Sequence, residues 1–164
     1  MSIAAKLSSL KKELDPIKVK LIAVSKTKPN SDILEAYAAG QRIFGENQVQ
    51  ELVKKYEELP KDIEWHLIGH LQTNKVKFIA PFIAMIHSVD SVKLLQEINK
   101  EAQKNHRNIA CLIQLHVAQE ETKFGLSLDE IHPFFQQLKA LDLSNVTING
   151  LMAMASFTQV QTQI

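Results

Sequence analysis

Short apolar segments alternate with amphipathic segments along the whole chain, and this alternation limits the folds available to it. Six segments have the length and composition of strands: residues 19–26, 42–45, 63–69, 85–89, 109–117 and 146–154. Segments with the apolar spacing of helices lie at residues 3–14, 31–39, 47–59, 74–82, 91–105 and 128–141. Regular alternation of this kind predicts an α/β fold with parallel strands joined by right-handed crossovers.

Residues that begin or end helices separate these segments. Ser31 is placed to cap the helix at 31–39, and Gly40 is placed to end it. Asp90 or Ser91 is placed to cap the helix that runs to residue 105. The first strand, residues 19–26, is short and largely apolar, which predicts burial on both faces.

Two α/β architectures fit this order of elements, an open doubly wound sheet and a (β/α)8 TIM-type barrel. A barrel has eight strands and about 250 residues, whereas this chain has 164 residues and six predicted strands. No predicted helix follows the sixth strand, and residues 156–164 do not resemble a domain end. We therefore expect residues 1–164 to form one domain that is truncated at the C-terminus and lacks two βα units.

Charge and composition argue against several classes of partner. The 19 basic and 18 acidic residues give a net charge of +1, so no strong field would attract nucleic acid or an anionic membrane. No apolar run approaches the roughly 18 residues of a membrane span, and the N-terminus has no signal-peptide pattern. We expect a cytoplasmic protein. The single cysteine, Cys111, excludes an intramolecular disulfide, and its apolar surroundings predict a buried thiol.

Polar residues follow the ends of the predicted strands, where α/β folds place their ligands. Lys26 ends the first strand, and partial loss of solvent there would free its amine to attack an aldehyde. The alternative is a lysine whose charged end simply reaches solvent at the rim. Asn47 follows the second strand and His70 follows the third.

Other polar groups have simpler interpretations. His66 and His70 lie four residues apart in a predicted strand, roughly 13 Å from each other, so one ion cannot bind both and we expect no metal site. The charged residues at 54–58 predict a solvated helix face. Met152 and Met154 alternate on one strand face, which is typical of core filling. The five glycines are isolated, and they form neither a P-loop nor a dinucleotide fingerprint.

Six segments in order resemble the signatures of the pyridoxal phosphate (PLP) homeostasis protein family. They are AVSKTKP at 23–29, FGENQVQE at 44–51, WHLIGHLQTNK at 65–75, HSVDS at 87–91, ETKFGL at 121–126 and GLMAMA at 150–155. The resemblance covers essentially the whole chain. It implies a TIM-type barrel of PLP fold type III, similar to the N-terminal domain of alanine racemases and here incomplete, with about six βα units.

The resemblance also implies a cofactor and the residues that contact it. Lys26 would form the Schiff base to pyridoxal 5′-phosphate, and Asn47, His70 and Met154 would lie near the cofactor. Members of the family act as carriers or regulators of PLP supply without established catalysis, so PLP-dependent apoenzymes are candidate partners. His116 departs from the pattern, because members commonly carry asparagine there.

The family holds the phosphate with segments after strands seven and eight, which residues 1–164 do not include. We therefore expect this chain to bind PLP weakly or not at all, and we expect a homodimer to cover the open barrel edge. Two alternatives stay open, an amino-acid racemase-like enzyme and a truncated member that cannot bind PLP. A racemase needs a second acid or base opposite Lys26, whereas Tyr37 and Tyr56 fall in predicted helices.

Overall fold

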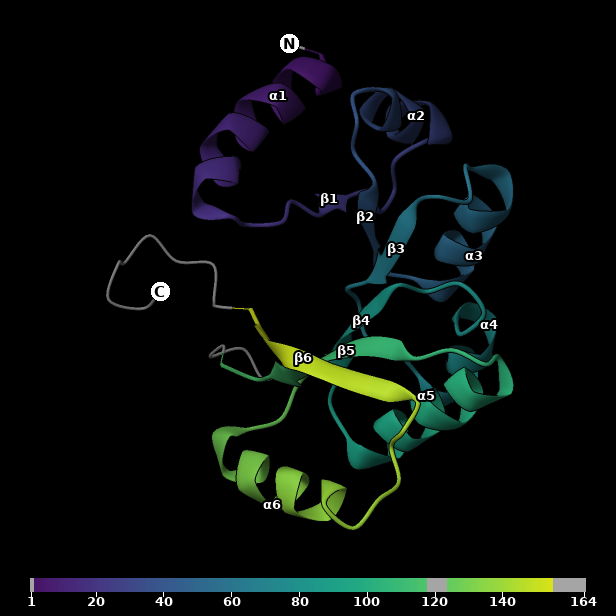
Figure 1. The fold of residues 1–164 in the computed structure, drawn as a ribbon, viewed down its shortest axis with the longest axis vertical. Coiled ribbons are helices and arrows are strands. Elements are labelled where there is room, and N and C mark those ends of the chain that lie inside the picture. The colour runs from purple at the N-terminus through teal and green to yellow at the C-terminus, as the bar shows by residue number, and fades with distance from the viewer. Residues whose placement is uncertain (1, 118–123, 155–164) are drawn as a thin grey trace.

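A single sheet of six parallel strands organises the protein. The computed structural model describes residues 2–117 and 124–154. The strands are β1 (Ala23–Val24), β2 (Ile43–Glu46), β3 (Glu64–Leu67), β4 (Met85–Val89), β5 (Ile109–Leu115) and β6 (Val146–Ala153). They lie in the order β1-β2-β3-β4-β5-β6, and every neighbouring pair is parallel (Figure 1).

This strand order distinguishes between the two expected architectures. A doubly wound sheet reverses its order at a switch point, whereas here each strand pairs with the next one in the sequence. That order is the order of a TIM-type barrel. Within the described residues β1 pairs only with β2 and β6 pairs only with β5. The predicted α/β fold with an incomplete barrel is therefore confirmed.

Helices connect successive strands and form the outer layer of the molecule. They are α1 (Ile3–Leu14), α2 (Asn30–Ala38), α3 (Val49–Glu58), α4 (Val76–Ile79), α5 (Val92–Lys104) and α6 (Leu128–Leu138), with 3₁₀ turns η1 (Asp15–Ile17) and η2 (Thr73–Lys75). No helix in residues 2–117 or 124–154 is both long enough and apolar enough to cross a membrane.

The predicted helix boundaries are partly right. The Ser91 side chain accepts a hydrogen bond from the Leu94 N–H and caps α5, as expected. Gly40 follows α2 with a φ of 85°, in the left-handed region that ends helices. The prediction for Ser31 is wrong, because α2 begins at Asn30 and its N-cap is Pro29. Proline at this point already fixes the extended backbone from which the helix starts.

The first strand is much shorter than expected. Only Ala23 and Val24 pair with β2, opposite Phe44 and Gly45. The Val19 and Val24 residues are 50% and 54% exposed, so the predicted burial on both faces is wrong. Apolar composition alone does not make a buried strand, since a neighbouring strand and a covering layer must also be present.

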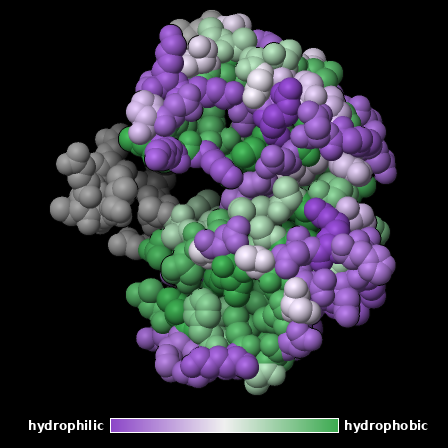
Figure 2. Space-filling model, in the orientation of Figure 1, coloured by the Kyte–Doolittle hydropathy of each residue, from purple (hydrophilic) through white to green (hydrophobic). Residues whose placement is uncertain are grey.

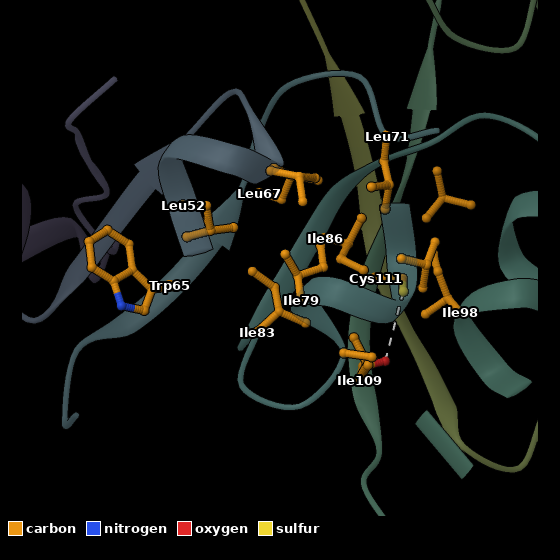
Figure 3. Close-up of a cluster of buried hydrophobic side chains, with 14 of the residues drawn as sticks. Leu52, Trp65, Leu67, Leu71, Ile79, Ile83, Ile86, Ile98, Ile109 and Cys111 are labelled. Atoms are coloured by element: carbon orange, nitrogen blue, oxygen red, sulfur yellow. Dashed lines mark hydrogen bonds between the residues drawn. The ribbon is translucent and has the colours of Figure 1, made fainter. Parts of the chain in front are cut away.

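The hydrophobic core lies between the sheet and the helices α3, α4 and α5. The close-up shows side chains from β3, β4 and β5 directed toward those of the helices (Figure 3). Its fully buried members include Leu52, Trp65, Leu67, Ile79, Ile83, Ile86, Ile98 and Ile109. Cys111 is buried among them, as predicted. Residues 121–123 of one family signature, Ala155 of another, and residues 156–164 lie outside the described ranges.

Candidate functional site

A cavity of about 530 Å³ lies at the carboxyl ends of the strands. The four residues predicted to bind a cofactor, Lys26, Asn47, His70 and Met154, all line it. The other lining residues are Val24, Ile68, Gly69, His87, Gln114, Phe124 and Met152. The molecule is hollowed between the part that carries α1 and α2 and the part that carries β6 (Figure 2). The fold thus brings the predicted residues together, although their role in cofactor binding stays a prediction.

Lys26 lies two residues beyond β1, at the rim of the cavity. Its side chain is exposed, so the expected partial loss of solvent is wrong for this structure. Among the described residues, no hydrogen bond or ion pair holds its Nζ. The amine is therefore accessible from the cavity and free to react with a carbonyl compound.

Asn47 is placed by a close approach between two loops. A Cβ atom on Gly69 would lie 2.3 Å from the Asn47 carbonyl oxygen and 2.7 Å from the Asn47 Cα. Only glycine allows the backbone after β3 to pass so near the backbone after β2. Gly69 therefore fixes the position of Asn47 at the cavity.

His70 is held between an aromatic ring and a carboxylate. Its ring stacks on Phe124, with ring centroids 3.8 Å apart and planes 13° apart. Its Nδ1 lies 3.4 Å from Oδ2 of Asp90, at the end of β4. The imidazole is thus oriented from two sides at the edge of the cavity.

A fold-back against β5 supplies the Phe124 side of the cavity. The side chain of Gln114 donates a hydrogen bond to the Phe124 carbonyl oxygen at 3.0 Å, and Leu126 makes a parallel bridge with Leu115. Gly125 has a φ of 130°, and a Cβ atom there would lie 2.6 Å from the His116 nitrogen. Sequence reasoning missed Gln114, because nothing in its own segment shows that residue 124 returns to it.

Two buried histidines form a second feature of the interior that the sequence did not reveal. Nδ1 of His66 on β3 lies 2.9 Å from Nε2 of His87 on β4. Burial lowers the pKa of His66 to about 4, and the nearby His87 and Lys20 contribute to this shift. Burial also lowers the pKa of His87. Both rings are therefore neutral at neutral pH, and one N–H joins them.

The sequence predicts that the charged residues at 54–58 form a solvated helix face, and this prediction is wrong for Lys55. Lys54 is exposed, but Lys55 is only 5% exposed and points beneath the turn that carries Lys26. Its ammonium group lies 2.7 Å from a carboxylate oxygen of each of Glu46 and Glu51. The sequence of a charged helix segment does not show whether one of its lysines faces water or a buried carboxylate.

The described residues show no group of three or more histidine, cysteine, aspartate or glutamate side chains placed to hold a metal ion. The polar groups at the cavity are instead an amine, two amides and two imidazoles. This set can form a covalent bond to a carbonyl group and donate hydrogen bonds to a polar ring or an anion.

Sequence comparisons find related proteins and a matching domain family. Residues 1–163 match the family described as alanine racemase, N-terminal domain. A pyridoxal phosphate homeostasis protein of Aquifex aeolicus is 43% identical over 141 residues, which is 85% of this chain and 61% of that protein. The chain thus spans about three fifths of the length of this curated relative.

Solved structures of related proteins are also similar to this chain in sequence and fold. The structure of PipY from Synechococcus elongatus PCC7942 without PLP is 40% identical, with a TM-score of 0.88 over 97% of this chain and 74% of PipY. The structure of PipY with PLP bound has a TM-score of 0.84 over 96% of this chain and 72% of PipY. Alanine racemase from Bartonella henselae shares the fold at 18% identity, with a TM-score of 0.69 over 92% of this chain and 42% of the racemase.

Proposed function

Because the chain belongs to the pyridoxal phosphate homeostasis protein family, within the alanine racemase N-terminal domain family, we propose that it binds pyridoxal 5′-phosphate and serves PLP homeostasis. Lys26 is the residue proposed to form the Schiff base. One observation carries the proposal: a free, accessible lysine amine opens onto a cavity that also contains Asn47 and His70. The curated relatives named pyridoxal phosphate homeostasis protein and the PipY structure with PLP bound support it.

The cavity is compatible in size with this cofactor, and in chemistry with its aldehyde group. Its volume of about 530 Å³ lies within the range of about 300–1,000 Å³ that is usual for small-molecule sites. Lys26 supplies the amine that an aldehyde group requires. When bound, PLP supplies an aldehyde carbon that a lysine can attack and a ring that withdraws electrons.

Each residue has a proposed task. Lys26 would hold the cofactor covalently through its Nζ, with loss of the aldehyde oxygen as water. Asn47 offers an amide that can donate to an oxygen of the ring or accept from it. His70 is oriented by Phe124 and Asp90, and its imidazole would offer a hydrogen-bonding group to the cofactor. Met154 would contribute a polarizable apolar group to the wall of the cavity.

Absorption spectroscopy tests the proposal directly. The purified chain is titrated with PLP beside Lys26→Ala, and the C=N bond is then reduced with borohydride and located by mass spectrometry. Because the family's phosphate-holding segments lie outside residues 1–164, binding is expected to be weak, and the titration extends to millimolar PLP. At that concentration we expect a visible band and a PLP adduct on Lys26 in the unaltered chain, and neither in Lys26→Ala. Lys28→Ala is the matched control, because Lys28 is an exposed lysine of the same segment and its loss should leave the band unchanged.

Each result of the titration has a clear meaning. A band that persists in Lys26→Ala, or an adduct on another lysine, would contradict the assignment of Lys26. No band at millimolar PLP in the unaltered chain would contradict the proposal that residues 1–164 bind the cofactor.

Three further expectations from the sequence belong to the proposal. PLP-dependent apoenzymes are proposed recipients, which spectroscopic transfer of PLP to an apoenzyme would test. A homodimer is proposed to cover the edge of β6, which pairs only with β5 in the described part of the chain. A monomer in sedimentation velocity at working concentrations would contradict the dimer. A cytoplasmic location also stays a prediction, and cell fractionation would test it.

A further inference from the structure

A buried polar cluster from two other elements lies beneath the turn that carries Lys26. Ser25 belongs to the turn itself, Glu46 ends β2, and Glu51 and Lys55 belong to α3. The side chains of Glu46 and Lys55 are 0% and 6% exposed, and that of Glu51 is 27% exposed. Because β1, β2 and α3 lie at the same end of the sheet (Figure 1), these groups meet at one point.

Lys55 is the centre of this cluster. Its Nζ donates to the Ser25 carbonyl oxygen, to Oε1 of Glu46 and to Oε1 of Glu51, each at 2.7 Å. An ammonium group has three N–H donors, so every donor of Lys55 has an acceptor. The Ser25 hydroxyl also donates to Oε1 of Glu46, at 2.6 Å. The lysine thus joins β2 and α3 to the turn.

The cluster holds the peptide units on both sides of Lys26. On one side, the Ser25 carbonyl oxygen accepts from Lys55, and the Ser25 N–H donates to the Gly45 carbonyl oxygen at 3.0 Å. On the other side, the Thr27 N–H donates to Oε1 of Glu51 at 2.7 Å. The Lys26 backbone therefore lies between two fixed points, while its side chain is free to reach the cavity.

The backbone at Thr27 needs this support. Its φ is 62°, in the left-handed region that a β-branched residue strongly disfavours. A backbone held in such a conformation persists only when its surroundings impose it, and such residues gather at functional sites. Two contacts hold it here, the bond from the Thr27 N–H to Glu51 and the bond from the Lys28 N–H to the Ser25 carbonyl oxygen at 3.0 Å.

The buried cluster is better explained by a role in positioning the Lys26 backbone than by a contribution to stability. The ladder between β1 and β2 contains only two residue pairs, and its last contact with the turn is the bond from the Ser25 N–H to Gly45, so the sheet does not hold the residues beyond Ser25. A buried ion pair often contributes no more stability than apolar residues of the same size. We propose that Glu46, Glu51 and Lys55 are positioning residues that fix the Lys26 backbone for attack on an aldehyde. This inference rests on the function proposed above.

Glu51 is the best place for the test, because its side chain is partly exposed. Lys55→Met would instead leave Glu46 buried without its cation. The rate of borohydride-trapped PLP adduct formation on Lys26 is measured by mass spectrometry in Glu51→Ala, Glu51→Gln and the unaltered chain. We expect Glu51→Ala to lower the rate by about tenfold or more, since small misplacements of a reacting group have large effects. Glu51→Gln keeps an acceptor for Thr27 and should restore most of the rate.

Amide hydrogen exchange provides a second measurement that does not require the cofactor. In Glu51→Ala the Thr27 amide should exchange about tenfold faster or more, and in Glu51→Gln it should stay protected. Lys54→Ala is the matched control, because Lys54 is the exposed neighbour of Lys55 on α3, and it should change neither quantity. Circular dichroism establishes that each variant is folded.

The two proposals fail in different ways. If the unaltered chain forms no adduct on Lys26, the cofactor site is refuted, and exchange at Thr27 still decides whether the cluster holds the turn. If folded Glu51→Ala forms the adduct at the unaltered rate, or if its Thr27 amide stays protected, the positioning role is overturned. If Glu51→Ala does not fold, Glu51→Asp tests the same contact, because its shorter side chain draws the carboxylate away from the Thr27 N–H. An unchanged adduct rate and a protected Thr27 amide in folded Glu51→Asp would overturn the positioning role.

Discussion

Burial of the His66–His87 pair changes the pKa of a single residue enough to affect stability. In the unfolded chain a histidine titrates near its ordinary pKa of about 6.5, whereas burial lowers the pKa of His66 to about 4. Between these values the unfolded state therefore binds more protons than the folded state does. The free energy of unfolding must then fall as the pH is lowered from about 6.5 toward 4.

Replacing His66 should reduce this pH dependence. The slope from one histidine reaches about 1.4 kcal/mol per pH unit, so His66→Gln should lose less stability than the unaltered chain between pH 7 and pH 5. Urea denaturation at pH 7, 6 and 5 measures the difference. His132→Gln, at an exposed position on α6, is the control and should keep the original slope. Parallel stability curves for His66→Gln and the unaltered chain would refute the prediction.

Two glycines, Gly45 and Gly69, lie where β2, β3 and their loops pack closely at the site. Gly45 lies within β2, and Gly69 lies just beyond β3. A Cβ atom on Gly45 would meet Cδ1 of Ile68 at 3.0 Å and Cγ2 of Ile22 at 3.2 Å, both side-chain atoms that can shift by a few tenths of an ångström. A Cβ atom on Gly69 would meet the backbone of Asn47, which cannot move without displacing the loop.

The same substitution at these two glycines should therefore have different consequences. Gly69→Ala should lower the free energy of unfolding by about 2 kcal/mol or more, as is typical for overpacking against a rigid neighbour. Gly45→Ala should cost less, because side-chain rotamers can adjust. Guanidinium denaturation of both variants measures the difference, and equal losses would contradict the assignment of Asn47 as the rigid contact.

At the scale of the whole molecule, one core extends behind the sheet from Trp65 to Cys111 (Figure 3). Cys111 is 0% exposed, and burial raises the pKa of its thiol to about 12. The thiolate is the form that reacts with disulfide reagents. Reaction of Cys111 therefore requires the core to open.

A thiol reagent should thus report on global unfolding. We expect the native chain to react with an aromatic disulfide at neutral pH at least about 10³-fold more slowly than the chain in guanidinium, as the folding equilibrium of a stable domain implies. Stopped-flow absorbance measures both rates. A Lys54→Cys variant supplies an exposed thiol, and one equivalent of it should react rapidly. A native Cys111 that reacts as fast as this thiol would show that the core opens locally.

The candidate site illustrates which residues sequence can find. Lys26, Asn47 and His70 each lie one to three residues beyond the end of a strand, so the topology alone brings them to one edge of the sheet. Gln114 and Lys55 were missed because their contacts depend on how loops and neighbouring elements fold back on one another, which local periodicity does not reveal. Lys55 in particular has a charged sequence context that is typical of a solvated face, and only its contact with Glu46 on β2 places it inside.

The sequence by itself determined the class of fold and most of the elements. Helix α1 at Ile3–Leu14 and strand β4 at Met85–Val89 agree with the predicted bounds, because local periodicity and cap residues act within a few residues of each other. Tertiary structure decided the rest. The length of β1 depends on where β2 offers partners, the burial of Lys55 depends on the acids beside it, and the pairing of His66 with His87 depends on strand register. Each of these is a contact between different elements of the fold, and such contacts are set by packing rather than by local preference.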